Sequence, residues 1–115
     1  MEESFKRGVA ALNAGNSALA IPLLADVARR MPREARFRAY YGRSLSANKQ
    51  KRHQAEAELK AAISLDENNA LYRVMLAELY RDLGMKRRAQ GEAQRALSLD
   101  PHNADVKRLV EELKG

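Results

Sequence analysis

The 115-residue chain contains no cysteine and no tryptophan, and only two phenylalanines and four tyrosines. Without cysteine, disulfide frameworks, thiolate zinc sites and cysteine nucleophiles are excluded together. Mean hydropathy is −0.57, and no apolar run reaches the roughly 18 residues of a membrane span. Acidic Glu2 and Glu3 stand where a secretory signal has basic residues. We therefore expect a cytoplasmic protein without a membrane span.

Residues that interrupt helices are also scarce, since the chain has three prolines and six glycines. Hydrophobic residues make up 45 % and charged residues 31 %, a balance that supports a folded core rather than a disordered chain. Alanine and leucine recur throughout, while strand-forming residues are few. This composition predicts one all-α domain.

The net charge of +6 is compatible with nucleic acid, an anionic surface or an acidic peptide as a partner. Basic and acidic residues number 5 and 4 in residues 1–34, 7 and 4 in 35–69, 6 and 4 in 70–103, and 3 and 3 in 104–115. The excess is spread along the chain and does not form a basic tail.

Three segments of the chain align with one another: residues 1–34, 35–69 and 70–103. Residues 62–66 (AISLD) and 96–100 (ALSLD) are nearly identical. Small residues recur at two equivalent places in the segments, namely Gly8, Gly42 and Ala77, and Ala20, Ala55 and Ala89. The middle segment has one extra residue, which we place between Lys49 and Gln54. A repeat of this length is typical of solenoid proteins.

Within each segment the spacing of apolar residues predicts two helices. In the third segment, Leu71, Val74, Met75, Leu79 and Leu83 recur at helical spacing, and Gly84 follows as a left-handed stop. Ala89, Ala93, Ala96 and Leu97 form the apolar face of the next helix, which Asp100 and Pro101 end. Residues 104–114 carry one further apolar stripe and read as a capping helix. We therefore expect seven helices.

Two residues depart from this pattern. Pro22 falls inside the second expected helix, so that helix either starts late, near Ile21, or is kinked. Gly91 falls inside the sixth expected helix, where glycine costs about 1 kcal/mol relative to alanine. We interpret Gly91 as an exposed or closely packed position without a functional role.

These residues resemble the tetratricopeptide repeat (TPR) family, whose repeats have small residues at positions 8 and 20 and proline at position 32. Gly8, Ala20 and Pro32 match in the first segment, and Glu67 replaces the proline in the second. The third segment matches closely, at Leu76, Ala77, Tyr80, Gly84, Ala89, Ala96 and Pro101. The resemblance implies a right-handed α-solenoid of three helix-turn-helix hairpins and a capping helix. It would form a single TPR domain over residues 1–115, which we expect to come from a longer protein.

The resemblance also implies a function: a non-catalytic scaffold, adaptor or co-chaperone-like module that binds a partner peptide or helix in a concave groove. The repeat positions that line this groove in the family fall here on eighteen residues: Phe5, Val9, Arg36, Tyr40, Arg43, Leu71, Val74, Met75, Glu78, Arg81, Glu2, Lys6, Leu12, Asn13, Ala39, Ser46, Ala47 and Asp82. The first ten of these are the candidate site. Apolar and aromatic residues mixed with arginine favour an acidic, apolar partner.

One variant of TPR binding is not expected here. Chaperone-binding TPR domains hold a C-terminal carboxylate with lysine, asparagine and arginine side chains. The matching positions are Phe5, Val9, Tyr40, Leu71 and Met75, none of which can make those hydrogen bonds. The carboxylate clamp is therefore absent from the sequence.

Two alternative functions remain open. Basic residues gather in two helix–helix turns, as Lys49, Lys51 and Arg52 and as Lys86, Arg87 and Arg88, and this basic rim would suit RNA or an anionic surface. No aromatic residues alternate with these basic residues, so nucleic-acid binding is the weaker hypothesis. The open ends of a short array would alternatively pair copies of the chain into a homo-oligomer.

The sequence contains no motif that indicates catalysis. His53 and His102 fall in expected turns and lack the spacing of metal ligands, and no phosphate-binding loop or nucleophile motif occurs. We expect no enzymatic activity, no cofactor and no metal site.

Overall fold

The computed structural model describes residues 1–115, and its fold is all-α, with seven α-helices, one 3₁₀ helix and no strand. The helices are α1 (Glu2–Asn13), α2 (Ser17–Arg30), α3 (Ala35–Ser46), η1 (Lys49–Lys51), α4 (Arg52–Leu65), α5 (Ala70–Asp82), α6 (Lys86–Leu99) and α7 (Ala104–Glu112). Seven α-helices are the expected number, and each predicted hairpin contains two of them. The chain divides into two compact units, Met1–Leu65 and Asp66–Gly115.

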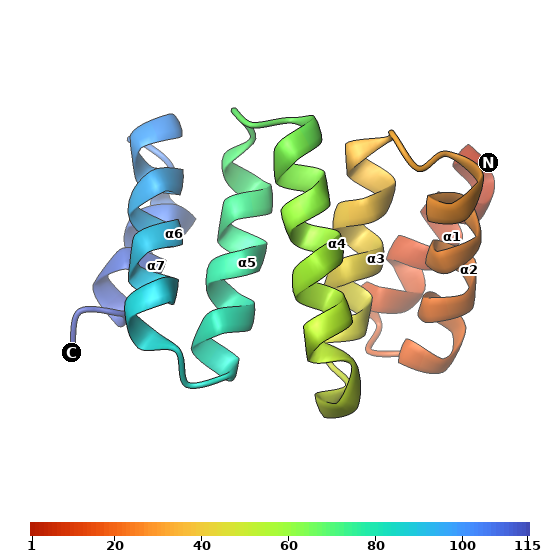
Figure 1. Ribbon diagram of the computed structural model, residues 1–115, viewed down its shortest axis with the longest axis horizontal. Helices are drawn as coiled ribbons and strands as arrows, with labels where there is room; N and C mark the ends of the chain where they lie inside the picture. Colours follow the sequence, from red (N-terminus) through yellow and green to blue (C-terminus); the bar gives the residue numbers. More distant parts are fainter. The chain divides into compact units, whose positions relative to one another are not determined.

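The first unit consists of two helical hairpins. Helix α1 packs on α2, α3 packs on α4, and α2 also packs on α3; the hairpin of α3 and α4 is visible in Figure 1. Its core contains the fully buried Leu24, Val27, Leu45 and Leu59 together with Phe37. Four alanines belong to the same core, since Ala20, Ala39, Ala55 and Ala62 are all 0 % exposed.

Glycine allows the paired helices of this unit to approach closely. A Cβ atom added at Gly8 would lie 2.7 Å from Leu24 Cδ2, and one at Gly42 would lie 3.0 Å from Leu59 Cγ and 3.1 Å from the Ala55 carbonyl oxygen. Any side chain at Gly8 would overlap the buried Leu24. Gly8 and Gly42, which recur at the same place in the first two segments, therefore mark tight helix contacts.

The second unit contains one hairpin and the final helix. Helix α5 packs on α6, and α6 packs on α7. Gly84 ends the turn after α5 with φ of +76°, the left-handed conformation that the sequence predicts. The Met85 N–H then donates to the Tyr80 carbonyl oxygen at 2.8 Å, which completes a Schellman-type helix end. Val106, Leu109, Val110 and Leu113 bury the apolar stripe of the last segment.

Helix α2 corrects one expectation about Pro22. The helix begins at Ser17, where the Asn16 side chain accepts a hydrogen bond from the Leu19 N–H, and continues through Pro22 to Arg30. Of the two alternatives for this helix, a late start near Ile21 or a kink, the late start is therefore wrong. Pro22 and Ala18 are both exposed, so the carbonyl that proline leaves without its helical donor belongs to a residue on the solvent side of the helix.

Candidate functional site

A cavity of about 330 Å³ opens on the first unit between α1 and α3. Its lining consists of Phe5, Lys6, Val9, Ala10, Asn13, Arg36 and Tyr40. Every lining residue except Ala10 belongs to the groove positions that the sequence predicts. We call this cavity the α1/α3 pocket. Its volume lies at the lower end of the range for binding sites, which suits one or two side chains of a partner.

Aromatic rings form the base of the α1/α3 pocket. The Phe5 and Phe37 ring centroids are 4.9 Å apart and tilted, and Tyr40 meets Phe5 edge-on at 5.4 Å. Phe5 is only 7 % exposed and Phe37 2 %, whereas Tyr40 and Val9 are partly exposed. Phe5 therefore supports the pocket from below, and Tyr40 and Val9 supply the apolar surface that a partner can reach.

Arg36 lies across these rings at the edge of the pocket. Its Cζ atom is 4.8 Å from the Phe5 centroid and 5.2 Å from the Phe37 centroid, within cation–π range. The same guanidinium donates to Glu2 Oε1, and its Nε lies 4.0 Å from Glu34 Oε1. The guanidinium therefore contacts two aromatic rings, and two carboxylates of the chain itself lie close to its charge.

Lys6 is the second cation of the α1/α3 pocket. Its side chain is exposed and makes no ion pair, and the neighbouring Arg7 is likewise exposed and unpaired but does not line the pocket. Arg43, another predicted groove residue, is exposed one helical turn beyond Tyr40 and lies outside the lining. The pocket thus combines an aromatic base with two cations and the amide of Asn13.

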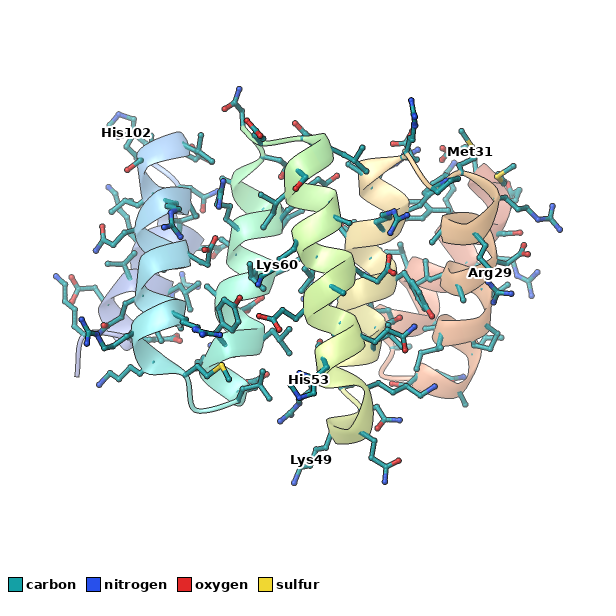
Figure 2. All side chains as sticks on the ribbon, in the orientation of Figure 1. Arg29, Met31, Lys49, His53, Lys60 and His102 are labelled. Atoms are coloured by element: carbon teal, nitrogen blue, oxygen red, sulfur yellow. The ribbon has the colours of Figure 1, made fainter.

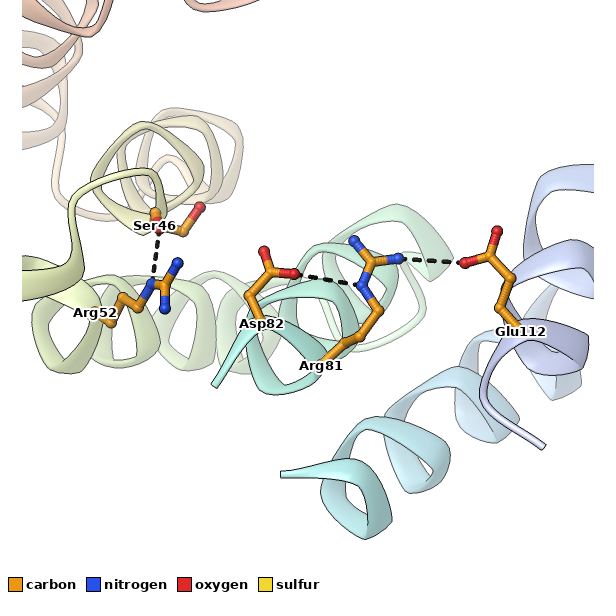
Figure 3. A network of polar contacts seen from close by, with 5 residues as sticks. All are labelled: Ser46, Arg52, Arg81, Asp82 and Glu112. Atoms are coloured by element: carbon orange, nitrogen blue, oxygen red, sulfur yellow. Dashed lines mark hydrogen bonds and ion pairs between the residues drawn. The ribbon is translucent and has the colours of Figure 1, made fainter. Parts of the chain in front are cut away.

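The predicted groove residues of the third repeat lie in the second unit, on α5. Leu71 is 44 % exposed, Val74 and Glu78 are partly exposed, and Met75 is only 3 % exposed. Arg81 donates to Glu112 of α7 and to Asp82, at 3.3 Å each (Figure 3). That these residues share a groove with the α1/α3 pocket stays a prediction.

The residues of the predicted basic rim fall into two groups. Lys49 and Lys51 lie in η1, in the stretch where the extra residue was expected, and Arg52 begins α4. Figure 2 shows Lys49 and His53 at this end of the hairpin. The Arg52 Nε donates to the Ser46 carbonyl oxygen at 3.2 Å, so Arg52 links the two helices of the hairpin (Figure 3). Lys86, Arg87 and Arg88 form the exposed first turn of α6, in the second unit.

The two histidines differ in their surroundings. His102 lies in the turn between α6 and α7, as expected, whereas His53 is the second residue of α4, so its assignment to a turn is wrong. No three side chains of His, Cys, Asp or Glu come together as a metal site would require. No helix combines the length and the apolar character that a membrane crossing needs.

The two units differ in net charge. Residues 1–65 contain 12 basic and 6 acidic side chains, and residues 66–115 contain 9 of each. The whole excess of +6 therefore belongs to the unit that carries the α1/α3 pocket. The net charges of the repeat segments do not show this difference, because the second segment includes Asp66 and Glu67 from the turn after α4.

Comparison with known proteins places the fold. No protein-family profile matches the sequence, and neither does any curated protein. Among solved structures, the TPR domain of OM64 from Arabidopsis superposes with a TM-score of 0.85 at 18 % identity, over 98 % of this chain and 93 % of that one. The chain has the TPR fold.

Two further TPR structures resemble this chain: one has higher sequence identity, and the other was solved with a bound peptide. A thermophilic TPR protein from Thermus thermophilus is 30 % identical over 87 % of this chain, with a TM-score of 0.77, and the aligned part spans half of that protein. The second TPR domain of human RPAP3, solved with the HSP70 peptide SGPTIEEVD, is 20 % identical, with a TM-score of 0.84 over 97 % of this chain and 92 % of that one.

Six of the seven residues that line the α1/α3 pocket are groove positions that the sequence predicts, but sequence reasoning missed other features of this TPR chain. It did not predict that Phe37 lies with Phe5 beneath Arg36, although an aromatic next to a groove position was a visible signal. It also missed the ion pairs Arg38–Glu58 and Arg73–Glu92, which link the two helices of a hairpin at 3.2 and 3.0 Å. These pairs occupy equivalent repeat positions, so aligning the segments for charge as well as for small residues would have revealed them.

Proposed function

We propose that this TPR chain is a non-catalytic protein-interaction module that binds an acidic, apolar peptide or helix of a partner protein through the α1/α3 pocket. The observation that supports this most is the pocket itself, where Tyr40 and Val9 offer apolar surface between Lys6 and Arg36. Aromatic and arginine side chains in a concavity are the residues that most often dominate binding energy.

The charge of the first unit supports an acidic partner. Its 12 basic and 6 acidic residues give a positive field that attracts an acidic segment before contact. Lys6 has no carboxylate partner in the chain, so a partner carboxylate would gain a new pair without breaking an existing one. A scaffold or adaptor role agrees with this proposal, as does the peptide complex of the human RPAP3 domain. A carboxylate clamp is not part of it.

A matched pair of charge reversals tests the proposal. The probe is an acetylated, amidated helical peptide of leucine, alanine and glutamate, labelled with fluorescein and titrated by anisotropy. Lys6→Glu removes a cation that lines the pocket, whereas Arg7→Glu makes the same change in total charge beside it. We expect Lys6→Glu to weaken binding at least about fivefold, since a contact of about 1 kcal/mol corresponds to that factor, and Arg7→Glu to weaken it less than about twofold.

Two results would contradict the proposal. Equal weakening by both variants would mean that the probe responds only to the field of the unit. Unchanged binding in Tyr40→Ala, with helical circular dichroism retained, would mean that the apolar surface of the pocket takes no part.

A further inference from the structure

A second cavity of the first unit lies away from the α1/α3 pocket. It has a volume of about 580 Å³ and lies between the start of α2 and the turn from α3 to η1. The residues around it are Ser17, Ala18, Ile21, Pro22, Ala47, Asn48 and Lys49. The two cavities share no lining residue. We call this second cavity the α2 hollow.

Pro22 leaves one wall of the α2 hollow with an unused hydrogen-bond acceptor. In an α-helix the carbonyl of residue 18 accepts from the N–H of residue 22, and proline has no N–H. A helical carbonyl points along the axis toward the residue four positions later, so the Ala18 carbonyl is directed toward Pro22, and both residues line the hollow. Both residues are exposed, so a ligand with an N–H group can approach this part of the helix from solvent.

The remaining lining has apolar, amide and cationic parts. Ile21 and Pro22 supply apolar surface, and the small Ala18 and Ala47 leave room for a chain to come close to the helix. Asn48 accepts from the Gln50 N–H at 2.9 Å through its oxygen, so its amino group is left to donate. Lys49 is exposed and forms no ion pair with any residue of the chain.

We propose that the α2 hollow binds an extended acidic segment of a partner protein. A backbone N–H of the segment donates to the Ala18 carbonyl, an aliphatic side chain covers Ile21 and Pro22, and a carboxylate pairs with Lys49. An extended peptide supplies all three groups at once, and the excess positive charge of this unit favours an acidic one. This site is additional to the α1/α3 pocket, and neither proposal depends on the other.

A peptide fits this lining better than a nucleic acid does. Single-stranded nucleic acids bind through aromatic stacking and a row of cations, whereas the α2 hollow has no aromatic residue and one cation. The unused carbonyl acceptor also repels a phosphate and favours an amide N–H.

The test is a titration of the whole chain, labelled with nitrogen-15, with an acetylated, amidated peptide of glycine, glutamate and leucine that stays extended. We expect shifts in the amide signals of Ala18, Ile21, Asn48 and Lys49. Lys49→Glu should weaken this binding at least about fivefold, and the control Lys51→Glu, in the same 3₁₀ turn but outside the lining, less than about twofold. Equal weakening by the two would overturn the proposal.

Pro22→Val examines the carbonyl separately. Valine keeps an apolar side chain of similar size and restores the N–H, so the Ala18 oxygen regains its helical partner. We expect binding to weaken about two- to tenfold, the range for loss of one hydrogen bond, while the variant resists urea better than the parent chain. Binding that stays the same in Pro22→Val would overturn the role of the carbonyl.

Two further measurements distinguish binding at the α2 hollow from binding at the α1/α3 pocket and from nucleic-acid binding. Lys6→Glu should leave the shifts at the α2 hollow in place, so failure of the α1/α3 pocket does not remove this site. If an oligouridylate shifted the same four signals and displaced the peptide, the basic turn would be a nucleic-acid contact and the peptide proposal would be wrong.

Discussion

Arg73 of α5 donates from Nη1 to Glu92 of α6 at 3.0 Å, across the two helices of the third hairpin. The Glu92 side chain is only 11 % exposed and that of Arg73 21 %, and Arg95 also bonds the same carboxylate. Arg38 and Glu58 make the equivalent contact in the second hairpin, one residue further apart along the chain. The added separation agrees with the extra residue placed in the basic stretch before α4.

The burial of Glu92 makes its charge matter for stability. Glu92→Gln keeps the shape of the side chain but leaves the guanidinium of Arg73 without its counter-charge, which we expect to cost about 1–3 kcal/mol. The control is Glu111→Gln, whose side chain is 70 % exposed and pairs with Lys114 at the surface. Exposed pairs contribute about 0–1 kcal/mol. Urea unfolding should separate the two variants, and equal losses would contradict the buried role of Glu92.

Gly8 and Gly91 are both inside helices but should respond oppositely to alanine. A Cβ atom at Gly91 would meet nothing closer than Arg95 Nη1 at 3.8 Å, so Gly91→Ala should stabilise the fold by about 0.5–1 kcal/mol through helix propensity. Gly8→Ala should destabilise it by about 1–3 kcal/mol, because the added methyl overlaps Leu24. Thermal unfolding followed by circular dichroism measures both. A stabilising Gly8→Ala would show that α1 and α2 are not tightly packed there.

The start of α6 offers a stabilising substitution. Met85 occupies the N-cap without a side-chain cap, and the first turn carries Lys86, Arg87 and Arg88 with no acid. Positive charge at a helix N-terminus opposes the helix dipole. Met85→Asp adds a capping acceptor and a favourable charge, so we expect about 0.5–2 kcal/mol of stabilisation. The gain should shrink in high salt, and a loss of stability would contradict the observed cap geometry.

Glu2 competes with an acidic ligand for Arg36. Because the Arg36 guanidinium is already bonded to Glu2, a partner carboxylate must displace that contact. The pair is exposed, so its contribution is small, about 0.2–1 kcal/mol. Glu2→Gln should therefore tighten binding of the helical glutamate peptide by up to about fivefold, and the gain should vanish when Arg36→Met is also present. Anisotropy titrations of the four chains complete this double-mutant cycle.

The fold could be predicted from the sequence because its strongest signals are steric. Gly8 and Gly42 occur where helices pack closely, Ala77 at the equivalent place is fully buried, and the left-handed turn at Gly84 favours glycine. Repetition of these signals in three segments identifies the hairpins more surely than any single helix would.

The sequence could not predict which residues of the candidate site are buried and which are exposed. Helical spacing gives the face on which Phe5 and Met75 lie, but both are buried, and only packing determines whether a residue supports a site or lines it. Pro22 was recognised as a departure, yet its position beside Ala47 and Lys49 comes from the fold. Pro22 also shows that low helix propensity at one residue does not by itself set a helix boundary, since α2 continues past it.

Mapping the bound helical peptide on the chain tests the central claim most directly. In a nitrogen-15 titration, the account predicts that the largest amide shifts fall on Lys6, Val9, Asn13, Arg36 and Tyr40. Lys6→Glu should need at least about five times more peptide to reach them, and Arg7→Glu less than about twice as much. Shifts confined to other faces of the first unit, with these five signals unmoved, would contradict the α1/α3 pocket as the binding site.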